Sequence, residues 1–456
     1  MSDPPVSRGF RGRGRGVQSA RIPPGQHLVS DFPILSAGPT PEPDLTGWRF
    51  TIEDGQSPIG RWSWHEFEAL PQTEVMVDIH CVTTWSKLDT HWRGVSIDTL
   101  LEAAGLAEPP GPFVLAHCDG GYTTNLPSED ILDGKAMIAT HFEDEPLDPE
   151  HGGPARLLVP HLYFWKSAKW VRKLQFLDHD QRGFWEELGY HSYGDPCASS
   201  AMTAIERATA APRPKRLQWM TANVREVIEE TSRVRSLVLD VPGWSGHRAG
   251  QHVDVRLTGE DGYQAQRSYS IASAPETPDL VITVERIIEG EVSPYLAGEV
   301  RPGDRFELRG PIGGYFVWTA PLDGHLFLVA GGSGIVPLMA MLRHRAATNS
   351  GTPATLLYSS RTVEDIIYRA ELQSLDRQAN TKIVHTLTRM QPAGWSGFSR
   401  RIDRAMLEAT CFPVAVRPRI FVCGPTPLVE VAARALRDIG HLQNLIKTER
   451  FGPTGG

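Results

Sequence analysis

The stretch that most constrains the fold of this chain is LVAGGSGIVPLMAML, from Leu328 to Leu342. In it, an apolar run passes into glycines and then into a helical pattern. Such a turn lets the backbone approach a pyrophosphate, and the helix N-terminus offers free N–H groups to it. Glycine-rich turns are common, so an ordinary tight turn between a strand and a helix is the alternative.

Apolar strand-like runs and helical segments alternate around this stretch. The runs are HLFLVA, ATLLYSS, KIVHTLT and RIFVCG, and the helical segments include VPLMAMLRHRAA and LVEVAARALRDIG. This alternation predicts a parallel sheet with helices on its faces over residues 321–456. Over residues 215–320, short β-branched runs separated by turn residues predict a small antiparallel barrel.

The predicted barrel contains RSYS, from Arg267 to Ser270. Because side chains alternate along a strand, Arg267 and Tyr269 share one face. An arginine can pair with a phosphate, and a tyrosine can pack on a flavin ring. The alternative is an exposed strand edge with an ordinary barrel tyrosine. Four further motifs follow RSYS along the chain, in the order GEVSPYL, RGPIGGYF, VCGPTPLV and ERFGPTGG.

In the order and spacing of these pieces, the chain resembles the ferredoxin–NADP reductase-like family from about Lys215 to Gly456. The resemblance implies a six-stranded antiparallel FAD-binding barrel followed by a parallel α/β NAD(P)-binding domain. It implies that FAD contacts Arg267, Tyr269, Ser270, Val292, Ser293 and Phe451, and that the nicotinamide nucleotide contacts Gly331, Gly332, Ser333, Gly334, Cys423 and Gly424.

The nucleotide preference depends on YSSR, which follows the second strand of the predicted parallel sheet. Ser360 and Arg361 could bind a 2′-phosphate, with the arginine as a charged fork. This pattern favours NADPH. A surface arginine at a strand end is the alternative.

The first half of the chain contains VDIHCVTTWSKLDTHWRG, in which Cys81 separates an apolar–polar alternation from a predicted tryptophan-rich turn. A buried free cysteine is usually a small hydrophobe. THWRG predicts a turn before an amphipathic helix with Ser96 as its N-cap. FVLAHCDGGYTTNLPSEDIL predicts two strands around a glycine turn. Two more strands are predicted in GGPARLLVPHLYFWKSAKWVRKLQFL, joined by a segment in which an anion could be bound by Lys166, Ser167 and Lys169.

This arrangement resembles the molybdopterin-binding domain of the sulfite oxidase family over roughly residues 26–196. It looks closest to the bacterial branch that includes methionine sulfoxide reductases, where Cys-Val-x-x-Trp-Ser carries the metal ligand. The resemblance implies that Cys81 is the single protein thiolate on molybdenum. It also implies that Tyr122 lines the metal site, although a core tyrosine is the alternative. The residues implied to hold the pterin phosphate are Lys166, Ser167 and Lys169.

Sulfite oxidases and nitrate reductases have an arginine shortly after the ligand cysteine, whereas Val82 to Trp85 follow Cys81 here. This difference disfavours sulfite and nitrate as substrates. An arginine distant in sequence, such as Arg93 or Arg156, could still reach the substrate. The five cysteines contain no CxxC pair, so the sequence indicates neither a zinc site nor an iron–sulfur cluster.

We therefore expect a multidomain α+β and α/β protein. A disordered Arg/Gly tail (1–26) precedes a molybdopterin-binding oxidoreductase domain (27–200), a linker (201–214), the barrel and the nucleotide-binding domain. The net charge of −8 argues against a general nucleic-acid binder. No secretory signal and no membrane-length apolar run is present, so we expect a cytoplasmic protein without a membrane segment.

The predicted cofactors define an electron path from NAD(P)H through FAD to a molybdopterin centre. We expect an enzyme that reduces a small oxidised substrate, with S-oxides and N-oxides as the leading class. No segment of haem-domain size is left over, so transfer is direct or uses a separate electron-transfer partner. The alternatives are a molybdenum dehydrogenase or oxidase that passes electrons to NAD(P)+ or O2, and a metal-free binding scaffold fused to a flavin reductase.

Overall fold

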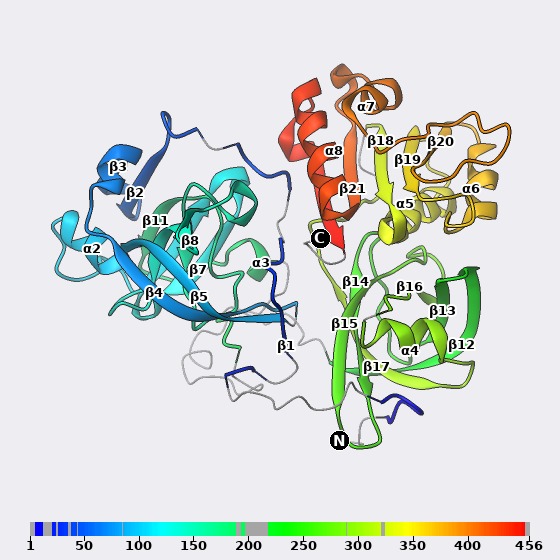
Figure 1. The fold of residues 1–456 in the computed structure, drawn as a ribbon, viewed down its shortest axis with the longest axis horizontal. Coiled ribbons are helices and arrows are strands. Elements are labelled where there is room, and N and C mark those ends of the chain that lie inside the picture. The colour runs from blue at the N-terminus through cyan, green and yellow to red at the C-terminus, as the bar shows by residue number, and fades with distance from the viewer. Residues whose placement is uncertain are drawn as a thin grey trace. The chain divides into compact units, whose positions relative to one another are not determined.

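The computed structural model describes residues 5–11, 21–23, 26–34, 38–42, 44–83, 85–187, 193–196, 218–288, 290–320 and 324–451 (Figure 1). The chain divides into two compact units. One comprises residues 17–34 and 40–215, and the other comprises residues 1–16, 35–39 and 216–456. The predicted linker (201–214) and Cys197 lie outside the described residues.

The unit built from residues 17–34 and 40–215 contains two sheets. The path of the six-stranded sheet is β1 (His27–Leu28), β5 (Trp85–Ser96), β8 (Met137–Phe142) and β10 (Arg156–Leu158), with β4 (Thr73–His80) on β5 and β9 (Glu145–Pro146) on β8. The five-stranded sheet has the order β3 (Ser57–Ser63), β2 (Arg49–Asp54), β11 (Val171–Leu177), β6 (Phe113–Cys118) and β7 (Thr123–Pro127). Both sheets contribute to one apolar core, which includes Phe50, Val95, Val114, Ile138, Leu157 and Leu174.

Three short helices, α1 (Trp64–Glu68), α2 (Ile97–Ala103) and α3 (Phe184–Glu187), complete this unit. The predicted helix after Ser96 is confirmed, because the Ser96 hydroxyl accepts a hydrogen bond from Thr99 N–H at 3.1 Å. The predicted turn at THWRG is wrong, because β5 continues through it. Gly94 permits close strand approach there, since a Cβ would lie 2.2 Å from the Ile138 carbonyl oxygen.

The predicted antiparallel barrel is confirmed. Its six strands are β12 (Met220–Thr231), β13 (Val234–Asp240), β14 (His252–Thr258), β15 (Gln264–Ser270), β16 (Leu280–Glu285) and β17 (Arg305–Ile312), in the order β15-β14-β17-β12-β13-β16. A bridge between Ile271 and Ile282 links the two ends of this order. The short helix α4 (Ser293–Gly298) packs against β16.

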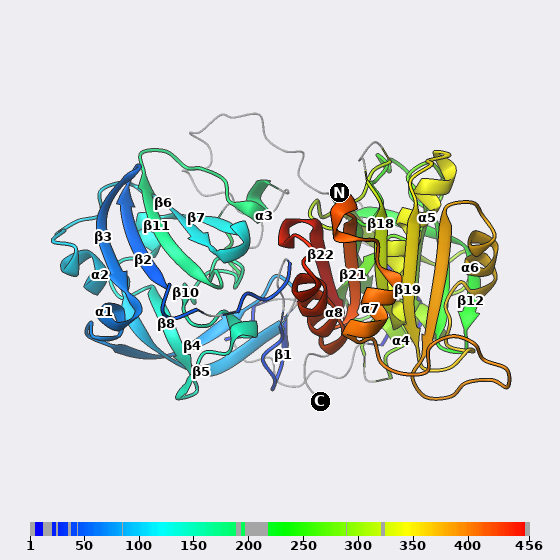
Figure 2. The same cartoon turned by 90° about the horizontal axis from the view of Figure 1, so that it is seen from above.

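The predicted parallel sheet is also confirmed. Its order is β20 (Thr381–Leu387), β19 (Ala354–Ser360), β18 (Leu326–Gly331), β21 (Arg419–Pro425) and β22 (Ile446–Phe451), and every pair is parallel (Figure 2). Its principal helices are α5 (Ile335–Ala347), α6 (Arg369–Asp376), α7 (Arg404–Thr410) and α8 (Thr426–Ile439).

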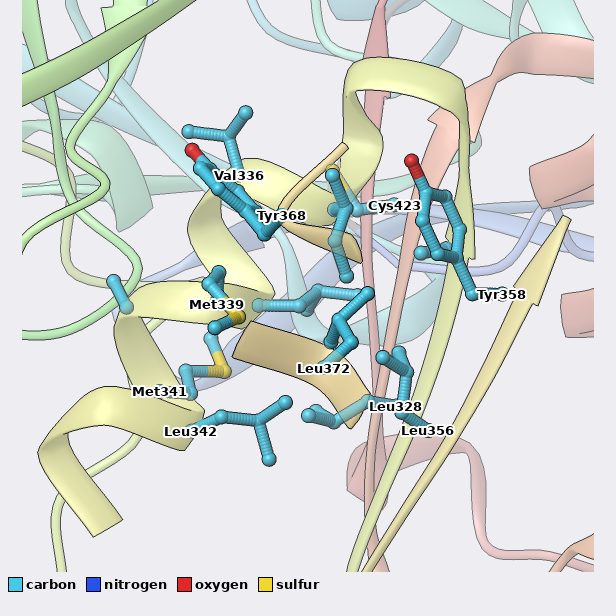
Figure 3. Close-up of a cluster of buried hydrophobic side chains, with 14 of the residues drawn as sticks. Leu328, Val336, Met339, Met341, Leu342, Leu356, Tyr358, Tyr368, Leu372 and Cys423 are labelled. Atoms are coloured by element: carbon cyan, nitrogen blue, oxygen red, sulfur yellow. The ribbon is translucent and has the colours of Figure 1, made fainter. Parts of the chain in front are cut away.

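The period of two along β18 explains why helices cover both faces of this sheet. Leu328 packs in a cluster with side chains of α5 and α6, such as Met339 and Leu372 (Figure 3). Its neighbours Phe327 and Val329 pack instead with side chains of α7 and α8. A strand that is buried on both faces needs a continuous apolar run, which LFLVA supplies.

Residues 5–11 differ from the disordered tail expected at the N-terminus. Phe10 is buried in the barrel core, and its ring meets Tyr295 edge to face at 5.5 Å between centroids. The Ser7 N–H donates to the Thr258 carbonyl at 2.8 Å, and the Tyr295 hydroxyl donates to the Arg8 carbonyl at 2.9 Å. This stretch is therefore part of the barrel.

We predict that Phe10→Ala destabilises the barrel, because it removes a buried aromatic side chain. Core truncations of this kind cost about 3 kcal/mol. Val6→Ala, at a position that is 49% exposed, is the matched control. Thermal unfolding of the two variants, followed through the release of bound flavin, checks the prediction. Equal midpoints for wild type, Phe10→Ala and Val6→Ala would show that residues 5–11 do not support the barrel.

Candidate active site

Cys81 lies between the end of β4 and the start of β5. Its N–H donates to the Trp85 carbonyl at 2.8 Å and closes a tight turn. The side chain is 7% exposed, and the Thr83 hydroxyl donates to its sulfur at 3.2 Å. Burial raises the pKa of the Cys81 thiol, whereas the Thr83 hydrogen bonds and the charge of Lys169 oppose that rise. A bound metal cation would favour the thiolate at this position.

Arg156, on β10, is a buried cation near this thiol. It is 1% exposed, and burial lowers its pKa to about 9, whereas negative charge on Cys118, Tyr122 or Cys81 would raise it. Two of its nitrogens donate to the carbonyls of His151 and Ser167, both at 2.6 Å. Within the described residues, no carboxylate pairs with Arg156, and its Nε has no hydrogen-bond partner. A buried guanidinium without a carboxylate partner can bind an anionic or strongly dipolar ligand by donating hydrogen bonds to it.

Two aromatic rings lie near the Arg156 guanidinium and belong to an apolar cluster that also contains Cys81. We call Phe32, Trp85, Trp92, Phe142 and Phe164 the aromatic cluster. The Arg156 guanidinium lies 4.1 Å from the ring centroid of Phe164 and 5.6 Å from that of Trp92. The Trp85 indole N–H is buried without a partner in the described part of the chain. Apolar walls therefore lie beside two N–H donors, Trp85 Nε1 and Arg156 Nε, that lack a partner among the described residues.

Tyr122 follows the glycine turn between β6 and β7, and its hydroxyl donates to the Trp165 carbonyl at 2.7 Å. Burial raises the pKa of Tyr122 well above its usual value, with a further rise from Glu186. Its phenol is therefore neutral and already engaged as a hydrogen-bond donor. The carbonyl of Tyr122 accepts from Cys118 N–H at 3.0 Å, which places Cys118 beside it.

The three residues expected to hold the pterin phosphate have separate partners. Lys166 is fully buried and pairs with Glu186 at 2.5 Å, and burial lowers its pKa while Glu186 opposes this. The Ser167 hydroxyl accepts from Val159 N–H at 2.9 Å, and Lys169 Nζ donates to the Glu150 carbonyl at 2.5 Å. Of the three, Lys169 is the residue whose charge acts on Cys81, where it opposes the rise in the thiol pKa.

These residues fit a molybdopterin group. The described residues contain no cluster of three or more His, Cys, Asp or Glu side chains that could hold a metal ion. A metal at Cys81 would therefore take its other ligands from a cofactor. A soft thiolate suits molybdenum. The N–H groups of Arg156 and Trp85 that have no partner in the described part of the chain suit oxygen or sulfur acceptors.

In the barrel, Arg267 and Tyr269 occupy alternate positions on β15. Burial raises the pKa of Tyr269, and the nearby charge of Arg267 opposes that rise, as expected for side chains on one face. Arg267 Nη1 donates to the Gln266 carbonyl at 2.7 Å, and Ser270 is buried at the strand end. Val292 is buried, and the Ser293 hydroxyl accepts from Ile287 N–H at 3.2 Å. Their contacts with FAD remain predictions.

The glycine turn after β18 meets the end of β21, so two motifs about ninety residues apart come together. A Cβ on Gly334 would lie 2.2 Å from the Cys423 carbonyl oxygen, and one on Gly424 would lie 3.1 Å from backbone atoms of Gly331. Gly332 has a positive φ of 54°, and its carbonyl accepts from the Tyr358 hydroxyl at 3.1 Å. The site predicted from Gly331, Gly332, Ser333, Gly334, Cys423 and Gly424 is thus contiguous.

Sequence reasoning missed Glu449, which pairs with Cys423 across β21 and β22. Burial raises the pKa of Glu449 to about 8, and the Cys423 thiol lies 4.0 Å from its carboxylate. Its neighbour Arg450 has a carboxylate partner in Glu430, whereas no ion pair of Glu449 occurs among the described residues. Phe451, two residues further on, is partly buried and packs against the apolar cluster that contains Cys423.

The residues expected to select NADPH lie at the end of β19. Ser360 is buried, and Arg361 lies 3.7 Å from Glu285 of the barrel. A carboxylate close to Arg361 would compete with a 2′-phosphate for the same cation. The preference for NADPH therefore remains a prediction.

Comparisons with known proteins agree with this architecture. Residues 37–185 match the model of the oxidoreductase molybdopterin-binding domain, residues 221–317 the oxidoreductase FAD-binding domain, and residues 328–434 the oxidoreductase NAD-binding domain. An uncharacterized oxidoreductase of Bacillus subtilis, YuiH, is 43% identical over 187 residues, which cover 41% of this chain and 94% of that protein.

The glycine betaine monooxygenase reductase subunit of Pseudomonas aeruginosa is 33% identical over 234 residues, which cover 50% of this chain and 63% of that protein. The ferredoxin reductase component of 3-ketosteroid-9-alpha-monooxygenase from Mycolicibacterium smegmatis is 32% identical over 238 residues, or 50% of this chain and 64% of that protein. Among solved structures, the FAD/NAD-binding domain of a Vibrio cholerae nitric oxide dioxygenase matches with a TM-score of 0.47 and 24% identity, over 51% of this chain and 99% of that one.

The chain belongs to the oxidoreductases with a molybdopterin-binding domain, here joined to FAD-binding and NAD-binding domains in one polypeptide. Its cofactors are the molybdenum cofactor, FAD and a nicotinamide nucleotide. These findings confirm the two family resemblances and the fold class expected from the sequence. Within the described ranges, no helix has the length and apolar character needed to cross a membrane.

We predict that Gly334→Ala weakens nucleotide binding, because the new methyl group would collide with the Cys423 carbonyl. Overpacking of this kind costs about 1–3 kcal/mol, and the same loss of binding free energy would lower the affinity for NAD(P)H by about 5- to 150-fold. Gly351→Ala is the matched control, since its Cβ would meet nothing within 4 Å. Titration of both variants with the nucleotide checks this, and an unchanged Kd in Gly334→Ala would refute the close approach.

We predict a pH-dependent stability term from Glu449. The folded protein holds this proton up to about pH 8, whereas the unfolded carboxyl releases it near its usual pKa of 4.5. Stability is therefore lost as the pH rises from about 4.5 to about 8, because the folded state binds the extra proton. Glu449→Gln should remove this loss, and Glu260→Gln, at an exposed position, should retain it. Free energies of unfolding measured across this pH range test the prediction. If the free energy of unfolding depends on pH in the same way in wild type and Glu449→Gln, the prediction is wrong.

Proposed function

We propose that this protein takes electrons from NAD(P)H and uses them, at a molybdopterin centre held by Cys81, to reduce a small S-oxide or N-oxide. The observation that carries the proposal is the presence of all three cofactor domains in one chain. When bound, FAD converts hydride transfer into single-electron steps, and the molybdenum cofactor supplies two-electron oxygen-atom chemistry.

The second half of the chain supports NAD(P)H as the electron source. It matches proteins named as reductase components of monooxygenases. Since the chain spans less than two thirds of those relatives, only the electron-supplying role is inferred from them. The close approach of the glycine turn to Cys423 and Gly424 brings together the residues predicted to contact the nucleotide, which supports this role.

The surroundings of Cys81 support a dipolar substrate with apolar groups. The aromatic cluster can enclose the carbon substituents of an S-oxide or N-oxide. Arg156 Nε and Trp85 Nε1, which have no hydrogen-bond partner among the residues that the structure describes, can donate to its oxygen, which carries partial negative charge. The Cys81 thiolate would balance the charge of Arg156, so the substrate need not be an anion.

Arg156 also favours a second candidate function, the oxidation of an oxyanion with electron transfer to NAD(P)+. A buried guanidinium without a carboxylate partner in the described chain can bind such a substrate directly. It would replace the arginine that follows the ligand cysteine in sulfite oxidases. The two candidates differ in the direction of electron flow.

We predict that Cys81→Ser abolishes substrate turnover while NAD(P)H-driven reduction of an artificial dye continues, because only the first reaction needs the metal. Cys411→Ser, a partly buried position in the nucleotide-binding domain, is the control and should retain both activities. Unchanged substrate turnover in Cys81→Ser would show that Cys81 is not the metal ligand.

Anaerobic stopped-flow mixing determines the direction of electron flow. Enzyme that has been reduced with NAD(P)H should be reoxidised by an S-oxide or N-oxide within the turnover time. Rapid bleaching of the flavin by sulfite, with no oxide able to reoxidise the reduced enzyme, would establish the second candidate instead.

A further inference from the structure

The chain segment of residues 26–34, which we call the arm, lies against the turn that carries Cys81. Its strand β1 pairs in parallel with the start of β5, with His27 opposite Trp85 and Leu28 opposite Ser86. The Val29 N–H donates to the Ser86 carbonyl at 2.9 Å. The arm therefore contacts the segment that immediately follows the turn.

Gln26, at the start of the arm, bonds both sides of the turn. It is 8% exposed, and its Nε2 donates to the Cys81 carbonyl at 2.8 Å. Its Oε1 accepts from the Ser86 hydroxyl at 3.2 Å, and that hydroxyl lies 2.9 Å from Nδ1 of His80. The Gln26 amide is therefore bonded directly to Cys81 and Ser86 and, through the Ser86 hydroxyl, is connected to His80.

We propose that Gln26 is a positioning residue for the metal ligand Cys81, a role that rests on the function proposed above. The Thr83 hydroxyl reaches the sulfur, but Thr83 is exposed, so it does not fix the backbone of the turn. Gln26 bonds the backbone of Cys81 directly. Groups one shell beyond a metal set the orientation of its ligands and adjust the metal–ligand bond.

Gln26 can hold the turn in place because a buried polar group that loses its hydrogen bond costs free energy. Without Gln26, the Cys81 carbonyl and the Ser86 hydroxyl each lose a partner in a buried region. The turn can then relax to recover other partners, and the direction of the Cys81 side chain changes with it. A residue that only stabilised the domain would affect the amount of folded protein, but not the geometry at the sulfur.

Gln26→Leu is the main variant, because it keeps the size of the side chain and removes both hydrogen bonds. Leu28→Ala is the matched control, since Leu28 belongs to the same arm but is 57% exposed. Gln26→Glu keeps the acceptor and loses the donor to the Cys81 carbonyl. Gln26→Glu can be used for the same measurements if Gln26→Leu does not fold.

The first measurement uses the full chain without the molybdenum cofactor. Alkylation of Cys81 by iodoacetamide is followed by mass spectrometry of its peptide, which separates it from the other cysteines. We expect Cys81 to react about two- to tenfold faster in Gln26→Leu and Gln26→Glu, a factor that corresponds to one lost hydrogen bond. Leu28→Ala should react at the wild-type rate.

The second measurement uses the loaded protein. At equal molybdenum content, the thiolate-to-metal charge-transfer absorption should shift in the Gln26 variants and stay unchanged in Leu28→Ala. Ser86→Ala should produce part of the shift, and the double variant should be less than additive, because both act on one turn. An unchanged Cys81 alkylation rate and an unchanged spectrum in both Gln26 variants would overturn the proposal. Failure of the wild type to bind molybdenum would instead refute the proposed function, while the alkylation rates would still report on Gln26.

Discussion

A single backbone hydrogen bond, from Cys81 N–H to the Trp85 carbonyl, closes the turn on which the first half of this protein depends. It joins β4 to β5 and directs the thiol into an apolar cluster rather than toward water. The same turn places Trp85 among the aromatic rings around Arg156. A buried thiol, a buried cation and apolar walls therefore lie together, and the turn contributes Cys81 and Trp85 to them.

The second half depends on a different constraint, the absence of side chains where two backbones meet. Gly334 lies against the Cys423 carbonyl, and Gly424 lies against Gly331, so the turn after β18 and the end of β21 form one surface. The parallel pairing of β21 with β22 then places Glu449 beside Cys423. A carboxyl that keeps its proton to about pH 8 is unusual, and here burial raises its pKa.

The sequence predicts elements well where one local pattern decides them. The apolar run at Leu326–Gly331 and the cap at Ser96 are such cases, and both elements form where expected. The turn predicted at THWRG is wrong. A glycine favours a turn when it is considered in isolation, but Gly94 instead allows the backbone of β8 to approach β5 closely. Side-chain partners at long range were not predictable. No local pattern pairs Lys166 with Glu186, leaves Arg156 without a carboxylate in the described chain, or packs Phe10 into a barrel that begins two hundred residues later.

The central claim is that electrons from NAD(P)H reach a molybdenum centre at Cys81 within one chain. Freeze-quenched samples of the anaerobic holoenzyme, taken after mixing with NAD(P)H and read by electron paramagnetic resonance, test it most directly. The account predicts a transient molybdenum signal that follows flavin reduction, at a rate that does not depend on protein concentration. Complete reduction of the flavin with no molybdenum signal at any time, in protein that contains the metal, would contradict it.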